Sequence, residues 1–148
     1  MMKLVDGEET VLVVTGSTPA ALTKDRSVAE WLRDEVDHRG GGATYRRALI
    51  ITDERYFGTP TFHSHPVIAI GGPGTNGVTG FLVQALPMVL AREERSFVQM
   101  GSDRNGRQAI LWGMDAASTR SAAEVFVLEG LLDALLGRIW TAGSTPLA

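Results

Sequence analysis

The segment of the chain with the clearest chemical potential is residues 68–77, which read IAIGGPGTNG. From Gly72 onward it spells G-x-G-x-x-G, a spacing typical of a strand-to-helix turn whose backbone N–H groups hold a phosphate. A dinucleotide site also needs a parallel strand that ends in an acidic residue about 20 residues later. Here Pro87 ends the following helix early, and the nearest acidic strand end, Asp103, falls in an expected hairpin turn. We therefore reject a dinucleotide site and interpret the glycines first as a structural turn and second as a weak anion site.

Polar residues also follow the other segments expected to be strands, and open parallel sheets bind ligands beyond the carboxyl ends of their strands. Asp53 follows one such strand and is a candidate base, while Asp115 joins the group if strand 108–112 runs parallel to the others. The candidate ligand-binding residues are Ser17, Asp53, Gly72, Gly74, Thr75, Asn76, Asp115, Thr119 and Arg120. A plainer interpretation stays open for each of them, because Ser, Thr, Asn and Asp often cap helices at strand ends.

Two other groups of reactive residues are weaker candidates for a functional site. His63 and His65 could place two imidazoles on one side of an extended segment, but the sequence offers no third metal ligand beside them. Ser17 lacks the G-x-S-x-G elbow of a hydrolase nucleophile. We therefore expect no metal, no cofactor and no catalytic triad.

The elements that must position these residues begin with three apolar runs typical of buried strands: 10–15 (TVLVVT), 48–52 (ALIIT) and 66–70 (PVIAI). A helix from Ser27 to Gly40, opened by a capping box with Glu30, separates the first two. This order predicts a parallel βαβ unit. The glycine turn then leads into a helix over 78–86, with Thr75 or Asn76 as its cap.

The second half of the chain predicts an antiparallel meander. Strands are expected at 88–91, 96–100 and 108–112, the last two joined across Asn105-Gly106. Asp115 can cap one long helix over 116–140, and residues 141–148 are expected to form a flexible tail. The apolar stripe of that helix comprises Val125, Leu128, Leu132, Leu135 and Ile139. The predicted fold is a single Rossmann-like α/β domain over residues 1–148, a three-layer α/β/α arrangement around a mixed sheet.

Composition narrows the functional classes. The 148 residues carry a formal net charge of −3 and a sequence pI of about 5.6, so the basic field of a non-specific nucleic-acid binder is missing. The absence of Cys excludes disulfides and thiol chemistry. No apolar run approaches the roughly 18 residues of a membrane span, and the first residues do not read as a signal peptide. We therefore expect a cytoplasmic protein that binds neither nucleic acid nor membrane.

Two phrases together resemble archaeal S-layer-type domains and related uncharacterised α/β proteins. They are IAIGGPGTNGVT, which matches a G-G-P-x-x-N turn, and ILWGMDAASTRSAAEVF, a strand and Gly followed by an acidic residue and a T-R-x-A-A helix start. The resemblance is carried by seven residues: Gly71, Gly72, Pro73, Asn76, Asp115, Thr119 and Arg120. The resemblance implies that the turn and the helix start lie side by side, with Asn76 and Arg120 tying loops together. The chain has no acidic Thr-rich stalk, so the resemblance bears on fold more than on a surface-layer role.

Two functional classes follow from these patterns. The first is a non-catalytic binding or assembly module that uses the glycine-turn edge, with a small anionic ligand or a second copy of the chain as partner. The alternative is an enzyme that acts on a small anionic or nucleotide-like substrate at the same edge, with Asp53 as base. The missing triad and the incomplete phosphate motif favour the first.

Overall fold

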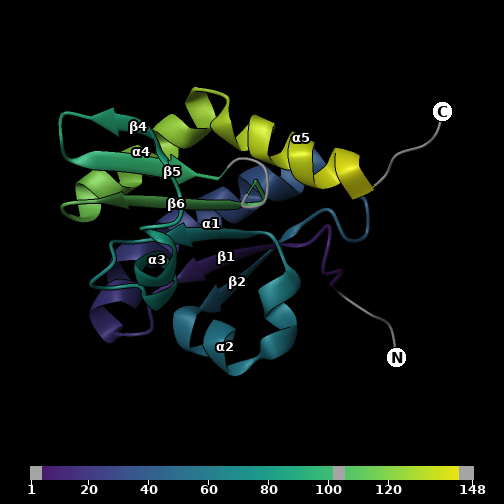
Figure 1. Cartoon of the computed structure of the whole chain (residues 1–148), viewed down its shortest axis with the longest axis horizontal. Coiled ribbons are helices and arrows are strands. Elements are labelled where there is room, and N and C mark those ends of the chain that lie inside the picture. The colour runs from purple at the N-terminus through teal and green to yellow at the C-terminus, as the bar shows by residue number, and fades with distance from the viewer. Residues whose placement is uncertain (1–4, 102–105, 144–148) are drawn as a thin grey trace.

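The computed structural model describes residues 5–101 and 106–143, and of residues 141–143 the backbone alone. Its centre is a six-stranded sheet in the order β2-β1-β3-β6-β5-β4 (Figure 1). Strands β2, β1, β3 and β6 are parallel, and β5 and β4 continue the sheet antiparallel. The strands span Val11–Thr15 (β1), Ala48–Thr52 (β2), Val67–Ile70 (β3), Met88–Arg92 (β4), Ser96–Met100 (β5) and Gln108–Gly113 (β6). The predicted mixed α/β sheet is therefore confirmed.

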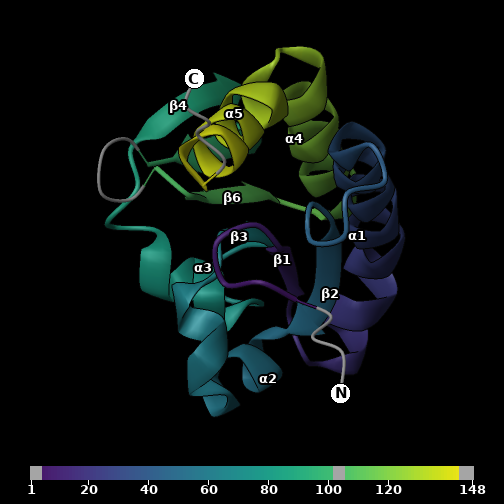
Figure 2. The ribbon, with the colours of Figure 1, turned by 90° about the vertical axis from the view of Figure 1, so that its right-hand side faces the viewer.

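Helices cover both faces of the sheet and make three layers (Figure 2). On one face lie α1 (Pro19–Gly40), α4 (Ala116–Leu128) and α5 (Leu131–Gly143), and on the other lie α2 (Asp53–Gly58), the 3-10 helix η1 (Pro60–Ser64) and α3 (Gly77–Leu82). The side chains of β1 alternate between the two cores: Val13 packs under α1, and Val14 packs on the α2–α3 side. Burial on both faces explains why β1 is a continuous apolar run.

Helix α1 begins earlier than the sequence indicated. Thr18 is its cap, because its Oγ1 accepts a 3.1 Å hydrogen bond from the N–H of Ala21, and Pro19 stands in the first turn, where no N–H partner is needed. Residues 23–26, which lie before the expected helix start at Ser27, are helical. The predicted end is confirmed: the helix ends at Gly40, and Gly41 closes it with a φ of +61°.

The prediction of one long helix over residues 116–140 is wrong. The segment forms two helices, α4 and α5, because Gly130 adopts a φ of +80° between them. This change of direction takes Leu128 off the buried stripe and leaves it 81% exposed, while Leu132, Leu135 and Ile139 remain buried. The caps at Asn76 and Asp115 are confirmed. Residues 141–143 of the expected tail belong to α5, whereas Asp103, Asn105 and residues 144–148 lie outside the described residues. Within the described part of the chain, no helix has both the length and the hydropathy to cross a membrane.

Candidate functional site

The candidate site lies where the four parallel strands end. Because β6 is parallel to β3, the segments that follow β1, β2, β3 and β6 all meet at one edge of the sheet. Strand β1 has β2 on one side and β3 on the other, so the chain reverses its direction of progress across the sheet between β1 and β3. Ligands of open α/β sheets bind at such a reversal point. The nine predicted residues are therefore gathered at the expected edge, but their contacts divide them into groups.

The first group joins the ends of β1 and β2 to the glycine turn. The hydroxyl of Ser17 donates a short hydrogen bond to Oδ1 of Asp53, and accepts one of 3.2 Å from the N–H of Glu54. The other carboxylate oxygen of Asp53 accepts a 2.7 Å hydrogen bond from the N–H of Gly77. The candidate base thus already has two partners, and it occupies the N–H group at the start of α3 that an anion would take.

The glycine turn satisfies its own polar groups. The N–H groups of Thr75 and Asn76 both donate to the carbonyl of Gly72 at 3.0 Å. The Asn76 side chain, 1% exposed, accepts from the N–H of Val78 at 2.9 Å and donates to the carbonyls of Val14 at 2.9 Å and Ile70 at 2.8 Å. One amide therefore caps α3 and fastens the ends of β1 and β3. These contacts are those of a structural turn, and they leave few N–H groups for a phosphate.

The helix start after β6 is similarly engaged. Oδ1 of Asp115 accepts a 2.8 Å hydrogen bond from the N–H of Ser118, and the other carboxylate oxygen pairs closely with Arg95. The N–H of Ser118 first, then the Ser118 hydroxyl and the Arg95 guanidinium, lower the pKa of Asp115 to about 2. Arg120 donates a 2.8 Å hydrogen bond to the hydroxyl of Ser27. It therefore joins α4 to α1, and not the loops that the resemblance implied.

Between these groups lies a narrow cavity of about 90 Å³, which we call the Asp25 crevice. It opens beyond the ends of β3 and β6, with α1 and α4 on either side. Its lining is Lys24, Asp25, Gly71, Gly72, Thr75, Gly113, Met114, Asp115 and Thr119. Four of the nine predicted residues are in that lining: Gly72, Thr75, Asp115 and Thr119. The other five, Ser17, Asp53, Gly74, Asn76 and Arg120, are not.

Asp25 is the residue that sequence reasoning missed. Its side chain is 3% exposed, and it makes no hydrogen bond or ion pair within residues 5–101 and 106–143. Burial raises the pKa of its carboxyl group, and the nearby charge of Lys24 offsets this only in part. The spacing of apolar residues could have indicated its burial. Asp25 precedes the buried Val28 by three residues and Leu32 by seven, so a helix that begins before Asp25 places all three on the same inward face.

Gly71 makes room for this carboxylate. Its φ is +109°, a conformation that other residues rarely adopt. A Cβ atom at this position would lie 3.0 Å from Oδ2 of Asp25 and 3.2 Å from Oγ1 of Thr75. Both oxygens therefore approach the bare backbone of the turn from within the crevice. The positive φ therefore favours glycine here, and the two oxygens leave little room for a larger side chain.

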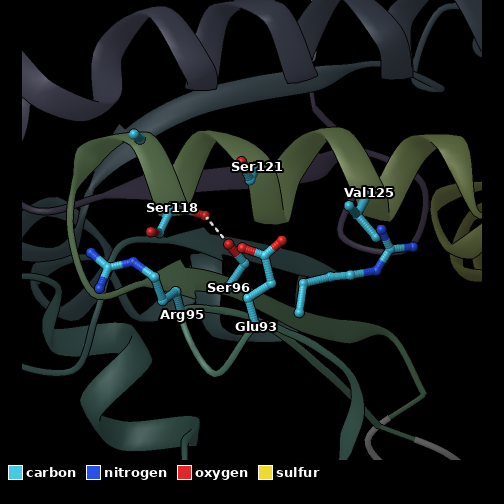
Figure 3. Close-up of a pocket in the computed structure, with 8 residues that line it drawn as sticks. Glu93, Arg95, Ser96, Ser118, Ser121 and Val125 are labelled. Carbon is cyan, nitrogen blue, oxygen red and sulfur yellow. Dashed lines mark hydrogen bonds between the residues drawn. The ribbon is translucent and has the colours of Figure 1, made fainter.

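A second, more open pocket of about 260 Å³ lies between the β4–β5 hairpin and α4 (Figure 3). Its two arginines are already engaged, Arg92 with Glu129 at 3.2 Å and Arg95 with Asp115, whereas Glu93 in the same lining forms no ion pair among the described residues. The hydroxyl of Ser96 donates to the carbonyl of Ser118 at 2.8 Å across the pocket. An anionic ligand here has to displace existing ion pairs, so for such a ligand this pocket is the weaker candidate.

The two histidines do not form a pair. Nε2 of His63 lies 2.9 Å from the carbonyl oxygen of Tyr56, and Nδ1 of His65 lies 2.9 Å from that of Thr10. Each ring thus binds the backbone of a different segment. Among the residues that the structure describes, no group of three or more His, Asp or Glu side chains is placed to hold a metal ion.

No family model fits the chain, and no curated protein is significantly similar to it. The likeness to archaeal S-layer-type domains therefore stays a prediction.

Proposed function

We propose that this chain is a non-catalytic binding module that takes a small ligand in the Asp25 crevice. The observation that carries the proposal is the contrast between Asp25 and its neighbours. Asp53, Asn76 and Asp115 are each engaged by structural hydrogen bonds, whereas the Asp25 carboxylate borders the crevice without a partner among the described residues. Burying an unpaired carboxylate costs free energy, so its retention favours a role in binding.

The hydrogen bonds of Asp53 and Asp115 also support the proposal that the module is not catalytic. The candidate base Asp53 is held between the hydroxyl of Ser17 and the N–H of Gly77, which restricts its access to a substrate proton. The Asp115 carboxylate has a lowered pKa and is a poor proton acceptor at neutral pH. Self-assembly is a further form of this function, because apolar side chains are exposed on α3 and β4, with Phe81 at 71% and Met88 at 49%.

One observation favours the alternative, an enzyme acting on a small anionic or nucleotide-like substrate at this edge. A buried carboxyl group with a raised pKa exchanges protons closer to neutral pH than an ordinary aspartate, which suits general acid–base work. In this alternative Asp25 takes the role first expected of Asp53, and Lys24 at the rim attracts the anion.

A thermal-shift screen tests the proposal, because a ligand that binds only the folded state raises the melting temperature. The screen uses nucleotides, sugar phosphates, amines and divalent ions on the wild-type chain, on Thr119→Val in the crevice, and on Thr79→Val. Thr79 is a buried threonine outside the crevice and serves as the matched control. We expect a stabilising ligand whose effect is reduced by Thr119→Val alone. A ligand effect equal in all three proteins contradicts the crevice as the site, and turnover of the ligand favours the enzyme. Light scattering on the same samples tests self-assembly.

A further inference from the structure

The Asp25 crevice contains one buried charged group, the Asp25 carboxylate, that forms no ion pair among the described residues. Asp115 lies in the lining but is paired with Arg95 from the hairpin. Lys24 also lies in the lining, but it is exposed and forms no ion pair with Asp25 within the described residues. The two stand next to each other in α1, so their side chains leave the helix about 100° apart. The unmet requirement in the crevice is therefore for a cation.

The oxygen atoms around Asp25 fit one kind of cation. The Thr75 hydroxyl donates to the carbonyl of Gly72 at 3.2 Å, which leaves its lone pairs free to accept. Thr119 is 4% exposed, and its hydroxyl has no hydrogen-bond partner among the described residues. The crevice thus offers a carboxylate and two hydroxyl oxygens as acceptors. An –NH₃⁺ group carries three N–H donors.

The size of the crevice and the number of oxygens narrow the class further. A volume of about 90 Å³ corresponds to roughly three water molecules, at about 30 Å³ each in the liquid. It admits an ammonium group and its first carbon, and a quaternary ammonium has no N–H to donate to the three oxygens. Calcium prefers six to eight oxygen ligands, and magnesium retains an octahedral shell, which one free carboxylate and two hydroxyls do not supply.

We infer that the Asp25 crevice binds a primary ammonium group, held by the Asp25 carboxylate and the hydroxyls of Thr75 and Thr119. This inference rests on the proposed binding function and names its ligand class. The ammonium group can belong to a free small amine or to the end of a longer chain. Because the carboxylate form of Asp25 makes the ion pair, binding weakens as the pH falls through the raised pKa of this residue.

The test is a titration with methylammonium chloride, read by melting temperature and by backbone amide chemical shifts, against potassium chloride and tetramethylammonium chloride at equal ionic strength. We expect saturable binding of methylammonium alone, with shifts confined to residues 24–25, 71–75 and 113–119. Asp25→Asn should weaken it by about tenfold or more. Lys24→Ala should retain or strengthen it, because a like charge leaves the rim. Thr79→Val, outside the crevice, should bind as the wild type does.

Several outcomes overturn the inference. They are equal effects of the three salts, equal binding by Asp25→Asn, or shifts outside the crevice. If Asp25→Asn fails to fold, the inference is tested by methylammonium binding to Thr119→Val and by the location of the chemical-shift changes in the wild-type chain. A butylammonium titration distinguishes a free small amine from the ammonium end of a longer chain. Binding as tight as that of methylammonium indicates the end of a longer chain. Selective binding of methylammonium indicates a free small amine. If no amine binds but another ligand loses affinity in Thr119→Val, the ammonium inference falls and the proposed function stands. If no ligand depends on the crevice, both fall.

Discussion

The backbone N–H of Gly77 donates a 2.7 Å hydrogen bond to Oδ2 of Asp53. The two residues follow different parallel strands, β3 and β2, so this bond crosses the edge of the sheet where a ligand is expected. The carboxylate takes a position at the start of α3 that a phosphate oxygen occupies in a nucleotide-binding turn. The protein thus supplies its own anion to the glycine turn, which explains how a G-x-G-x-x-G spacing can serve structure.

Removing that carboxylate should destabilise the fold. We expect Asp53→Ala to lower the free energy of unfolding by roughly 1–3 kcal/mol, because it removes hydrogen bonds that a charged group makes to Ser17 and Gly77. Glu54→Ala is the control, since Glu54 is the exposed neighbour, and its effect should stay within about 0.5 kcal/mol. Urea unfolding measures both. Equal stabilities of the two variants would show that the Asp53 contacts contribute little.

Asn76 should be a larger determinant of stability than a simple helix cap. A lost cap costs about 1 kcal/mol, and Asn76→Ala also strands the carbonyls of Val14 and Ile70, so we expect a total of roughly 2–4 kcal/mol. Asn76→Asp separates the two roles, because it keeps the oxygen that caps α3 and loses the N–H donors. Denaturation of Asn76→Asp with a midpoint equal to that of the wild type would contradict the role of the donors.

Leu132 and Leu128 form a matched pair of leucines on either side of the break at Gly130. Leu132 is 0% exposed and Leu128 is 81% exposed. We expect Leu132→Ala to cost about 2–5 kcal/mol, because it leaves a cavity in the core. Leu128→Ala should change stability by no more than about 0.5 kcal/mol. Comparable losses in the two variants would mean that Leu128 is covered in solution, as an assembly interface would require.

The same pair shows where sequence reasoning reached its limit. Buried strands and the antiparallel meander could be predicted, because apolar runs such as residues 10–15 and turn signals are local. The break at Gly130 was missed because the apolar spacing continues across it, and a glycine is compatible both with an unbroken helix and with the positive φ that it adopts here. The early start of α1 was missed because Ser27 and Glu30 have the spacing of a capping box, whereas the residue that caps the helix is Thr18. Because the helix was predicted to begin only at Ser27, Asp25 fell outside it, and the sequence alone did not bring this residue to the inward face of α1 and the crevice.

The pH dependence of stability should report the contacts of Asp115. Its pKa is lowered to about 2, first by the N–H of Ser118, then by the Ser118 hydroxyl and by Arg95. A carboxyl group whose pKa is lower in the folded than in the unfolded chain stabilises the fold above its unfolded value, near 3.9. That stabilisation is lost as the pH falls through about 2. We therefore expect Asp115→Asn to melt below the wild type at neutral pH, and the difference between the two melting temperatures to shrink as the pH falls from about 4 toward 2. Arg95→Ala should keep most of this pH dependence, because the Ser118 N–H is the larger cause, and a difference independent of pH would contradict this account of the Asp115 cap.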